Sequence, residues 1–147
     1  MQMLDACGRK IDYLRISITD RCNLRCVYCM PENGVSSISH DSLLRYEEIV
    51  RLVRLMQPLG VQKVRITGGE PMARRGCLDL VQNLHEMGGL SRIAMTTNVL
   101  LLRGRMQEAR DKGLTSINIS LDTLDPVCYR QMTRLGNVAP VLDAIDE

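Results

Sequence analysis

Apolar and polar residues alternate along residues 13–19, the first strongly patterned segment of the chain. Leu14, Ile16 and Ile18 share one face of this segment, and polar side chains occupy the other. A period of two residues is typical of a β-strand with one buried face. Similar apolar runs predict three further strands, over residues 61–67, 92–97 and 116–121.

The segments between these strands place apolar residues at helical spacing. Residues 46–56 open with acidic Glu47 and Glu48, which favour a helix N-terminus, and stop before Pro58. Similar patterns predict helices over residues 77–87 and 103–112, and an unfinished helix over residues 138–147. Strands that alternate with helices indicate βαβ units, so we predict an α/β fold with a parallel sheet.

The chain length limits this fold further. At 147 residues and 45% hydrophobic content, we expect residues 1–147 to form a single domain, with nine methionines filling a core that lacks Phe and Trp. A parallel (βα) barrel normally needs more residues, so we expect a partial barrel, truncated after about four βα units. The fourth strand would keep an open edge, which predicts low solubility for the isolated chain.

The charge balance argues against two classes of partner. The chain has 19 basic and 17 acidic residues, a net charge of +2, which gives no sign of a nucleic-acid or anionic-membrane surface. No apolar run reaches the roughly 20 residues that span a bilayer, and the first residues lack the regions of an export signal. We therefore expect a cytoplasmic protein that binds neither nucleic acid nor membrane.

Each predicted strand is followed by a group of polar residues. In parallel α/β folds, ligands bind at the carboxyl ends of the strands, so these groups are expected to form one site. The first group is a cysteine loop, and the others are Thr67 to Glu70, Thr96 to Asn98, and Ser120 to Asp122.

In the second group, Gly68 and Gly69 can adopt positive φ and let the backbone approach a ligand. Glu70, which follows them, can accept a hydrogen bond from an ammonium or hydroxyl group. An ordinary strand-to-helix turn is the alternative interpretation of this segment.

The cysteine loop carries the strongest chemical signal. Cys22, Cys26 and Cys29 are separated by three and then two residues, a spacing that gathers three thiolates. Zinc bound with Cys7 or His40 as a fourth ligand, and a disulfide with one spare thiol, are alternatives. A four-iron cluster with only three thiolate ligands keeps one iron open to a small molecule.

The remaining cysteines, Cys7, Cys77 and Cys128, are scattered singly, and we assign them no chemistry.

This loop resembles the motif of the radical S-adenosyl-L-methionine (SAM) enzymes, in which an aromatic residue, here Tyr28, precedes the last cysteine. The resemblance implies a 4Fe–4S cluster and SAM as cofactors. It places Gly69 and Glu70 near the methionine part of SAM, Ser120 in contact with SAM, and the backbone of Tyr28 against the adenine. Without the resemblance, Ser120 would be an ordinary strand serine and Tyr28 a packed aromatic residue.

Four segments together, residues 13–23, 63–71, 96–98 and 117–122, look like successive blocks of the GTP 3',8-cyclase family, the molybdenum cofactor biosynthesis protein A enzymes. The resemblance covers the family's N-terminal half. It implies a lyase in which SAM is cleaved reductively to a 5'-deoxyadenosyl radical. That radical abstracts the C3' hydrogen of GTP to give 3',8-cyclo-7,8-dihydro-GTP.

The implied partners are GTP as substrate, an electron donor for the cluster and a possible second copy of the chain in a homodimer. Two other functions remain open: a radical SAM reaction on another substrate, and an inactive metal-binding module.

Two arginines on the predicted barrel interior also need an explanation. An unpaired buried charge is costly, so Arg15 and Arg65 call for an anion, which a triphosphate or an internal salt bridge to Glu70 or Asp122 would supply. The family resemblance makes Arg15, Arg65 and Thr96 contacts to GTP. Lys63 would lie on the same face as Arg65, although it could simply be solvated near the strand start.

The chain also departs from the family pattern. A second set of three cysteines, which the family carries in its C-terminal region, has no counterpart in this sequence. Val99 stands where the family usually has Gly. If this position requires positive φ, a β-branched residue would strain the turn.

Overall fold

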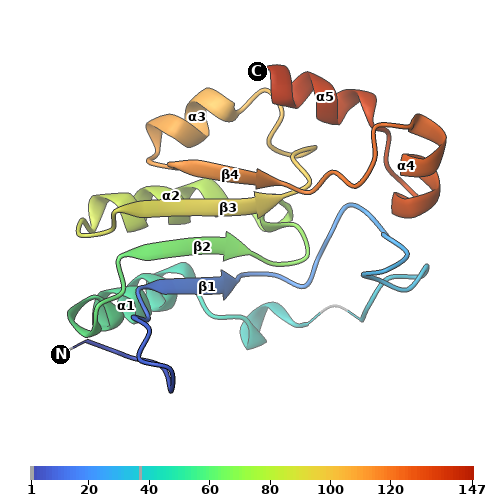
Figure 1. Cartoon of the computed structure of the whole chain (residues 1–147). Coiled ribbons are helices and arrows are strands. Elements are labelled where there is room, and N and C mark those ends of the chain that lie inside the picture. Colours follow the sequence, from blue (N-terminus) through green and yellow to red (C-terminus); the bar gives the residue numbers. More distant parts are fainter. Residues whose placement is uncertain (1, 37) are drawn as a thin grey trace.

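The computed structural model describes residues 2–36 and 38–147. Its central element is a sheet of four parallel strands in the order β1-β2-β3-β4 (Figure 1). The strands are β1 (Tyr13–Ser17), β2 (Lys63–Thr67), β3 (Arg92–Thr97) and β4 (Ser116–Ile119). The predicted α/β class and parallel sheet are therefore confirmed.

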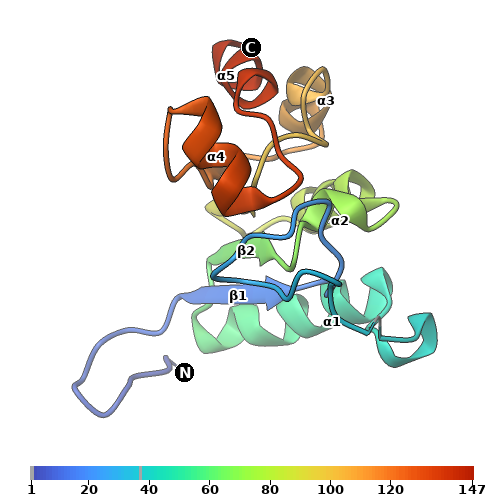
Figure 2. The same ribbon diagram turned by 90° about the vertical axis from the view of Figure 1, so that its right-hand side faces the viewer.

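Helices connect the strands in the expected alternation. Helices α1 (Tyr46–Met56), α2 (Cys77–Glu86) and α3 (Met106–Asp111) lie between strands, whereas α4 (Pro126–Thr133) and α5 (Ala139–Asp146) both follow β4. Short 3-10 turns lie at His40–Ser42, Gln57–Leu59 and Pro71–Ala73. Figure 2 shows α1, α2 and α3 on one side of the sheet. Among the described residues, no helix has both the length and the apolar character needed to cross a membrane.

Local signals explain where α1 begins and ends. The backbone N–H of Arg45 donates to the Glu48 carboxylate at 2.7 Å, which satisfies a free donor at the helix start. After α1, Pro58 ends the α-helical hydrogen bonding, and Gly60 reverses the chain with φ 106°. The predicted bounds of this helix are confirmed.

Other strands and helices begin or end at different residues than predicted. β1 ends at Ser17 rather than residue 19, β2 begins at Lys63 rather than residue 61, and α3 begins at Met106 rather than residue 103. Helix α4 was not predicted at all. It begins with an Asp125 side chain that accepts a hydrogen bond from the Cys128 N–H at 2.7 Å, followed by Pro126 in the first turn.

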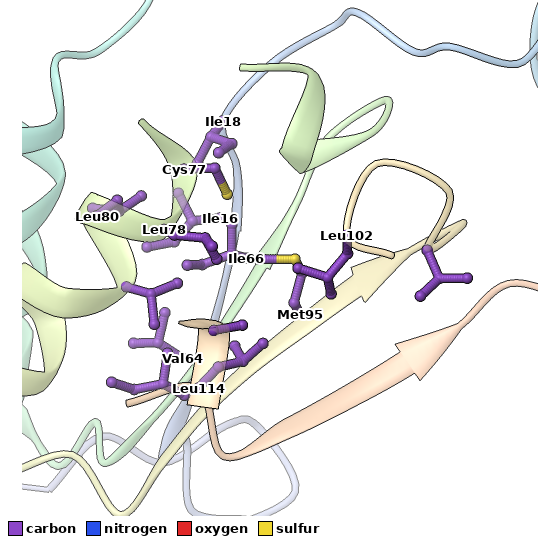
Figure 3. Packing of buried hydrophobic residues seen from close by; sticks show 14 of the residues in the cluster. Ile16, Ile18, Val64, Ile66, Cys77, Leu78, Leu80, Met95, Leu102 and Leu114 are labelled. Carbon is purple, nitrogen blue, oxygen red and sulfur yellow. The ribbon is translucent and has the colours of Figure 1, made fainter. Parts of the chain in front are cut away.

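The core lies between the sheet and the helices on one of its faces. Val64 and Ile66 of β2 are fully buried, and so are Leu80 and Leu84 of α2. Figure 3 shows Cys77 and Leu78 of α2 close to Ile16 and Ile66 of the strands. The opposite face carries Arg15, Arg65, Thr96 and Asn118, none of which is buried. The two faces therefore follow the predicted alternation.

Strand β4 is an edge strand, since within the described part of the chain it pairs with β3 alone. Exposed apolar side chains follow it along the C-terminal segment: Leu124, Val127, Leu135, Leu142 and Ile145. The predicted open edge is confirmed, and the low solubility of the isolated chain stays a prediction.

Val99 lies in the turn after β3 with φ 67°, in the left-handed region, and its side chain is fully buried. This backbone conformation is unfavourable for a β-branched residue. The sequence expectation of a strained turn is therefore confirmed.

We predict that Val99→Ala costs less stability than Val64→Ala, although both side chains are fully buried. Each change removes the same two methyl groups, but at position 99 it also removes the β-branching that makes φ 67° especially unfavourable, which offsets part of the loss. Urea unfolding of both variants measures the difference. Equal losses would show that the turn at Val99 stores no strain.

Candidate active site

A cavity of about 180 Å³ opens at the carboxyl edge of the sheet. All four predicted polar groups contribute to its lining, so the strand ends meet at one cavity, as the sequence predicted. Most of the predicted site residues line it: Arg15, Cys22, Cys26, Tyr28, Cys29, Gly69, Glu70, Thr96 and Ser120. Lys63 and Arg65 do not.

Hydrogen bonds shape the cysteine loop between β1 and α1. The N–H groups of Cys29 and Met30 both donate to the Cys26 carbonyl oxygen, at 3.0 and 2.9 Å, which winds the segment into one turn. The Cys22 sulfur accepts from the Leu24 N–H at 3.4 Å and from the Asn98 side-chain amide at 3.8 Å. These donors would favour a thiolate at position 22.

The three thiols suit a cluster better than a single ion. Cys22 and Cys26 are partly buried and Cys29 is exposed, and all three are free. Within residues 2–36 and 38–147, no three Cys, His, Asp or Glu side chains converge as one metal ion would require. A four-iron cluster needs no such convergence, because each thiolate binds a different iron. The donor set therefore fits a 4Fe–4S cluster.

Burial raises the pKa of Cys22 and of Cys26 above that of an ordinary thiol. Metal binding at these positions must therefore displace protons.

The other cysteines do not complete this site. Cys7 lies in the N-terminal segment closed by the bridge between Leu4 and Lys10, at the opposite end of the sheet from the cysteine loop (Figure 1). It is not placed to act as a fourth zinc ligand. The side chain of His40 lies outside the described part of the structure. Cys77 is buried in α2, where burial raises its pKa to about 12, so its thiol is unreactive at neutral pH.

Glu70 ties two strand ends together. Its carboxylate is 1% exposed and accepts from the Thr97 hydroxyl at 2.7 Å and from the N–H groups of Asn98 at 2.8 Å and Met72 at 3.1 Å. Burial raises the pKa of Glu70, and the three donors act in the opposite direction. The Asn98 side chain also donates to Asn23 of the cysteine loop, at 2.8 Å. The network therefore fixes the β2, β3 and cysteine segments relative to one another.

Gly68 and Gly69 are needed for a different reason than the one predicted. Neither has positive φ. Instead, a Cβ atom at Gly68 would lie 2.6 Å from the Thr19 carbonyl oxygen, and one at Gly69 would lie 2.4 Å from the Arg21 carbonyl oxygen. The N–H groups of Gly69 and Glu70 donate across this contact at 2.7 Å each. Two backbone segments therefore meet where a side chain would not fit.

Tyr28 extends from the cysteine loop to the end of β4. Its hydroxyl donates to the Asp122 carboxylate at 2.6 Å, and this bond raises the pKa of the tyrosine. The side chain is 62% exposed, so the alternative of a packed aromatic residue is wrong. Ser120 is exposed at the same edge, and its N–H donates to the Thr97 carbonyl oxygen at 2.9 Å.

The arginines of the sheet face have no acidic partner. None of the ion pairs among the described residues includes Arg15 or Arg65, and the Arg65 Nε atom is buried without a hydrogen-bond partner. The Arg65 guanidinium lies 5.7 Å from the centre of the Tyr13 ring and 3.5 Å from the Thr96 hydroxyl. The internal salt bridge considered from the sequence is therefore wrong.

Lys63 lies away from the cavity, at the amino end of β2, where its ammonium group pairs with Asp12 at 2.8 Å. This position argues against the predicted contact to GTP. The alternative of a solvated lysine near the strand start fits the structure better, since the Lys63 side chain is 42% exposed.

Sequence reasoning missed two residues of the cavity, Tyr129 and Thr133, because α4 itself was not predicted. The Asp125–Pro126 pair, a helix start signal, could have revealed this helix.

The sequence matches the family described as the Radical SAM superfamily over residues 16–147. The GTP 3',8-cyclase of Petrotoga mobilis is 50% identical over 143 residues, which cover 97% of this chain and 44% of that protein. The GTP 3',8-cyclase of Geobacter sulfurreducens is 44% identical over 145 residues, or 99% of this chain and 44% of the relative. The chain thus spans less than half the length of these relatives.

Solved structures agree on the fold. Streptococcus suis SuiB bound to S-adenosylmethionine superposes with a TM-score of 0.69 at 24% identity, covering 84% of this chain and 28% of that chain. BtrN in complex with AdoMet and 2-DOIA gives a TM-score of 0.63 at 17% identity, covering 97% of this chain and 56% of BtrN. At these identities the likeness shows the fold alone.

We predict that Gly69→Ala destabilises the chain by at least about 2 kcal/mol, because the new Cβ overlaps backbone that has no room to move. Gly104→Ala is the control, since Gly104 has φ +72° but no atom within 4 Å of the added Cβ. That change should cost only the backbone penalty of about 1 kcal/mol. Urea unfolding compares the two, and equal losses would contradict the close-contact argument.

Proposed function

Since this chain belongs to the radical SAM superfamily, whose cofactors are a 4Fe–4S cluster and SAM, we propose that it carries out the radical chemistry of a GTP 3',8-cyclase in molybdenum cofactor biosynthesis. The observation that carries the proposal is the cavity at the carboxyl edge. It brings the cysteine loop together with Gly69, Glu70, Thr96 and Ser120. The identity of 44–50% to GTP 3',8-cyclases along nearly the whole chain supports this substrate.

In this proposal, Cys22, Cys26 and Cys29 hold the cluster and leave one iron free for SAM. When bound and given one electron, the two cofactors would supply a 5'-deoxyadenosyl radical that takes the C3' hydrogen of GTP; after C3' bonds to C8, a second electron and a proton complete 3',8-cyclo-7,8-dihydro-GTP. An alkyl radical reacts with almost any nearby C–H bond, so the protein must hold both molecules in contact and keep water out.

The SAM contacts follow the strand ends. Gly69 and Glu70 are proposed to meet the methionine part of SAM, Ser120 to contact SAM, and the Tyr28 backbone to meet the adenine. Of the two Glu70 carboxylate oxygens, Oε2 has a single donor, the Asn98 N–H. It therefore keeps a lone pair for an ammonium group.

The sheet face supplies the contacts to GTP. Arg15 and Arg65 have no carboxylate partner, and the buried Nε of Arg65 lacks a hydrogen bond. A triphosphate would satisfy these donors with charge-assisted hydrogen bonds. Thr96 lines the cavity and accepts a hydrogen bond from the Arg65 guanidinium at 3.5 Å, so we assign it to the same substrate.

The proposal also requires an electron donor that reduces the cluster. Free thiolates and a reduced cluster call for a reducing compartment, so we place the reaction in the cytoplasm. A homodimer remains part of the proposal as the state in which the chain would act.

We predict that replacing Cys22, Cys26 or Cys29 by Ala abolishes the cluster, because three thiolates are the minimum for it here. Cys7→Ala, at an exposed thiol far from the loop, should keep full iron content. Iron analysis and electron paramagnetic resonance of the reduced, anaerobically reconstituted protein measure the result. Wild-type protein should show a signal that changes on adding SAM. Full iron in all three loop variants would refute the assignment.

We predict that Arg65→Gln weakens GTP binding at least about tenfold, because a lost charge-assisted contact to phosphate is worth about 1.5 kcal/mol or more. Arg54→Gln, which removes an exposed arginine on α1, is the control and should bind like wild type. Equilibrium binding of GTP tests both variants. Unchanged affinity for GTP in the Arg65 variant, with SAM cleavage intact, would point to a different substrate.

A further inference from the structure

Arg134, which directly follows α4, has a strained backbone. Its φ is 62° and its ψ is −41°, and the Leu135 N–H donates to the Thr133 carbonyl oxygen at 2.8 Å around it. This is a γ-turn with positive φ at its centre, a conformation that is rare for a residue with a side chain. Such strain persists only where surrounding contacts impose it.

The side chain of Arg134 makes those contacts with the cysteine loop. Its Nη1 atom donates to the Arg25 carbonyl oxygen and to the Met30 carbonyl oxygen, each at 2.9 Å. In the sequence, these two carbonyls stand immediately before Cys26 and immediately after Cys29. A single guanidinium nitrogen therefore holds both ends of the turn that carries two of the three cysteines.

The end of α4 holds the same loop through its backbone. The N–H groups of Arg25 and Val27 donate to the carbonyl oxygens of Thr133 at 3.1 Å and Met132 at 2.8 Å. These are carbonyls of the last helical turn, which would otherwise lack partners. In Figure 2, the loop that follows β1 lies beside α4, in agreement with these bonds.

Gly136 allows this close packing. A Cβ atom there would lie 2.7 Å from the Tyr129 ring and 3.2 Å from the Leu24 side chain. The corner after α4 is therefore shaped to receive the cysteine loop.

We propose that Arg134 is a positioning residue that holds the cysteine loop in its cluster-binding conformation before any metal arrives. The identity of the bound cluster rests on the function proposed above, whereas the clamp rests on the two hydrogen bonds that Arg134 donates.

The decisive variant is Arg134→Gly. Glycine adopts positive φ without strain, so the turn is kept or even stabilised while the clamp is lost. Arg134→Lys keeps the charge and three donors on a shorter side chain. Arg103→Gln is the control, because it removes a surface arginine that pairs with Asp143 at 3.0 Å.

The first readout is hydrogen exchange in the metal-free full chain. In the Arg134→Gly variant, the amides of Arg25 and Val27 should exchange at least about tenfold faster, while Ile66 in the core strand stays protected. Arg134→Lys should restore part of the protection, and Arg103→Gln should match wild type. Wild-type exchange at Arg25 and Val27 in Arg134→Gly would overturn the proposal.

The second readout is iron retention after anaerobic reconstitution, followed with a chelator. Arg134→Gly should lose iron at least about tenfold faster than wild type and Arg103→Gln, with Arg134→Lys between them. Equal rates would overturn the positioning role. If the loop loosens as expected but Ala variants of the three cysteines keep their iron, the clamp stands and the proposed cluster fails.

Discussion

The buried carboxylate of Glu70 is the interaction on which the site depends. Removing a carboxylate from water is costly unless donors surround it, and Glu70 is 1% exposed with three donors in place. Two of the donors come from Thr97 and Asn98, at the end of the neighbouring strand. The penalty for separating them therefore holds the β2 and β3 ends in one arrangement.

The other contacts of the site extend from this centre. The Asn98 side chain donates hydrogen bonds to Asn23 and to the Cys22 sulfur, which hold the cysteine loop against the end of β3. The tight backbone contact at Gly69 fixes the entry to the same loop from the other side. Helix α4 and Arg134 then hold the far end of the loop. A segment without regular secondary structure is thus positioned from three directions, as a site built on a loop requires.

The pattern of apolar and polar residues was sufficient to predict the sheet and the polar groups at its carboxyl edge, because both follow from local rules. Alternation places Ile16 on the face that the helices cover and Arg15 on the opposite face, and parallel strands bring their carboxyl ends to one edge. The strain at Val99 was expected from the family resemblance, because the family usually has Gly at this position, and the φ of 67° agrees with it. Contacts between segments that are distant in the sequence could not be predicted in this way. The roles of Gly68 and Arg134 depend on backbone segments that are distant in sequence, and the partner of Lys63 was visible only in the folded chain.

The arginines of the sheet face show why overall charge is a poor guide to a local site. A net charge of +2 suggested no anionic partner surface. Folding nevertheless pairs many acidic residues elsewhere, among them Asp12 with Lys63 and Asp143 with Arg103, and it commits Glu70 and Asp122 to hydrogen bonds. Arg15 and Arg65 are left on the face beside the cavity without a carboxylate. Arg15 is exposed, but the partly buried Arg65 has an Nε atom without a hydrogen-bond partner, which supports our proposal that an anionic ligand binds this face.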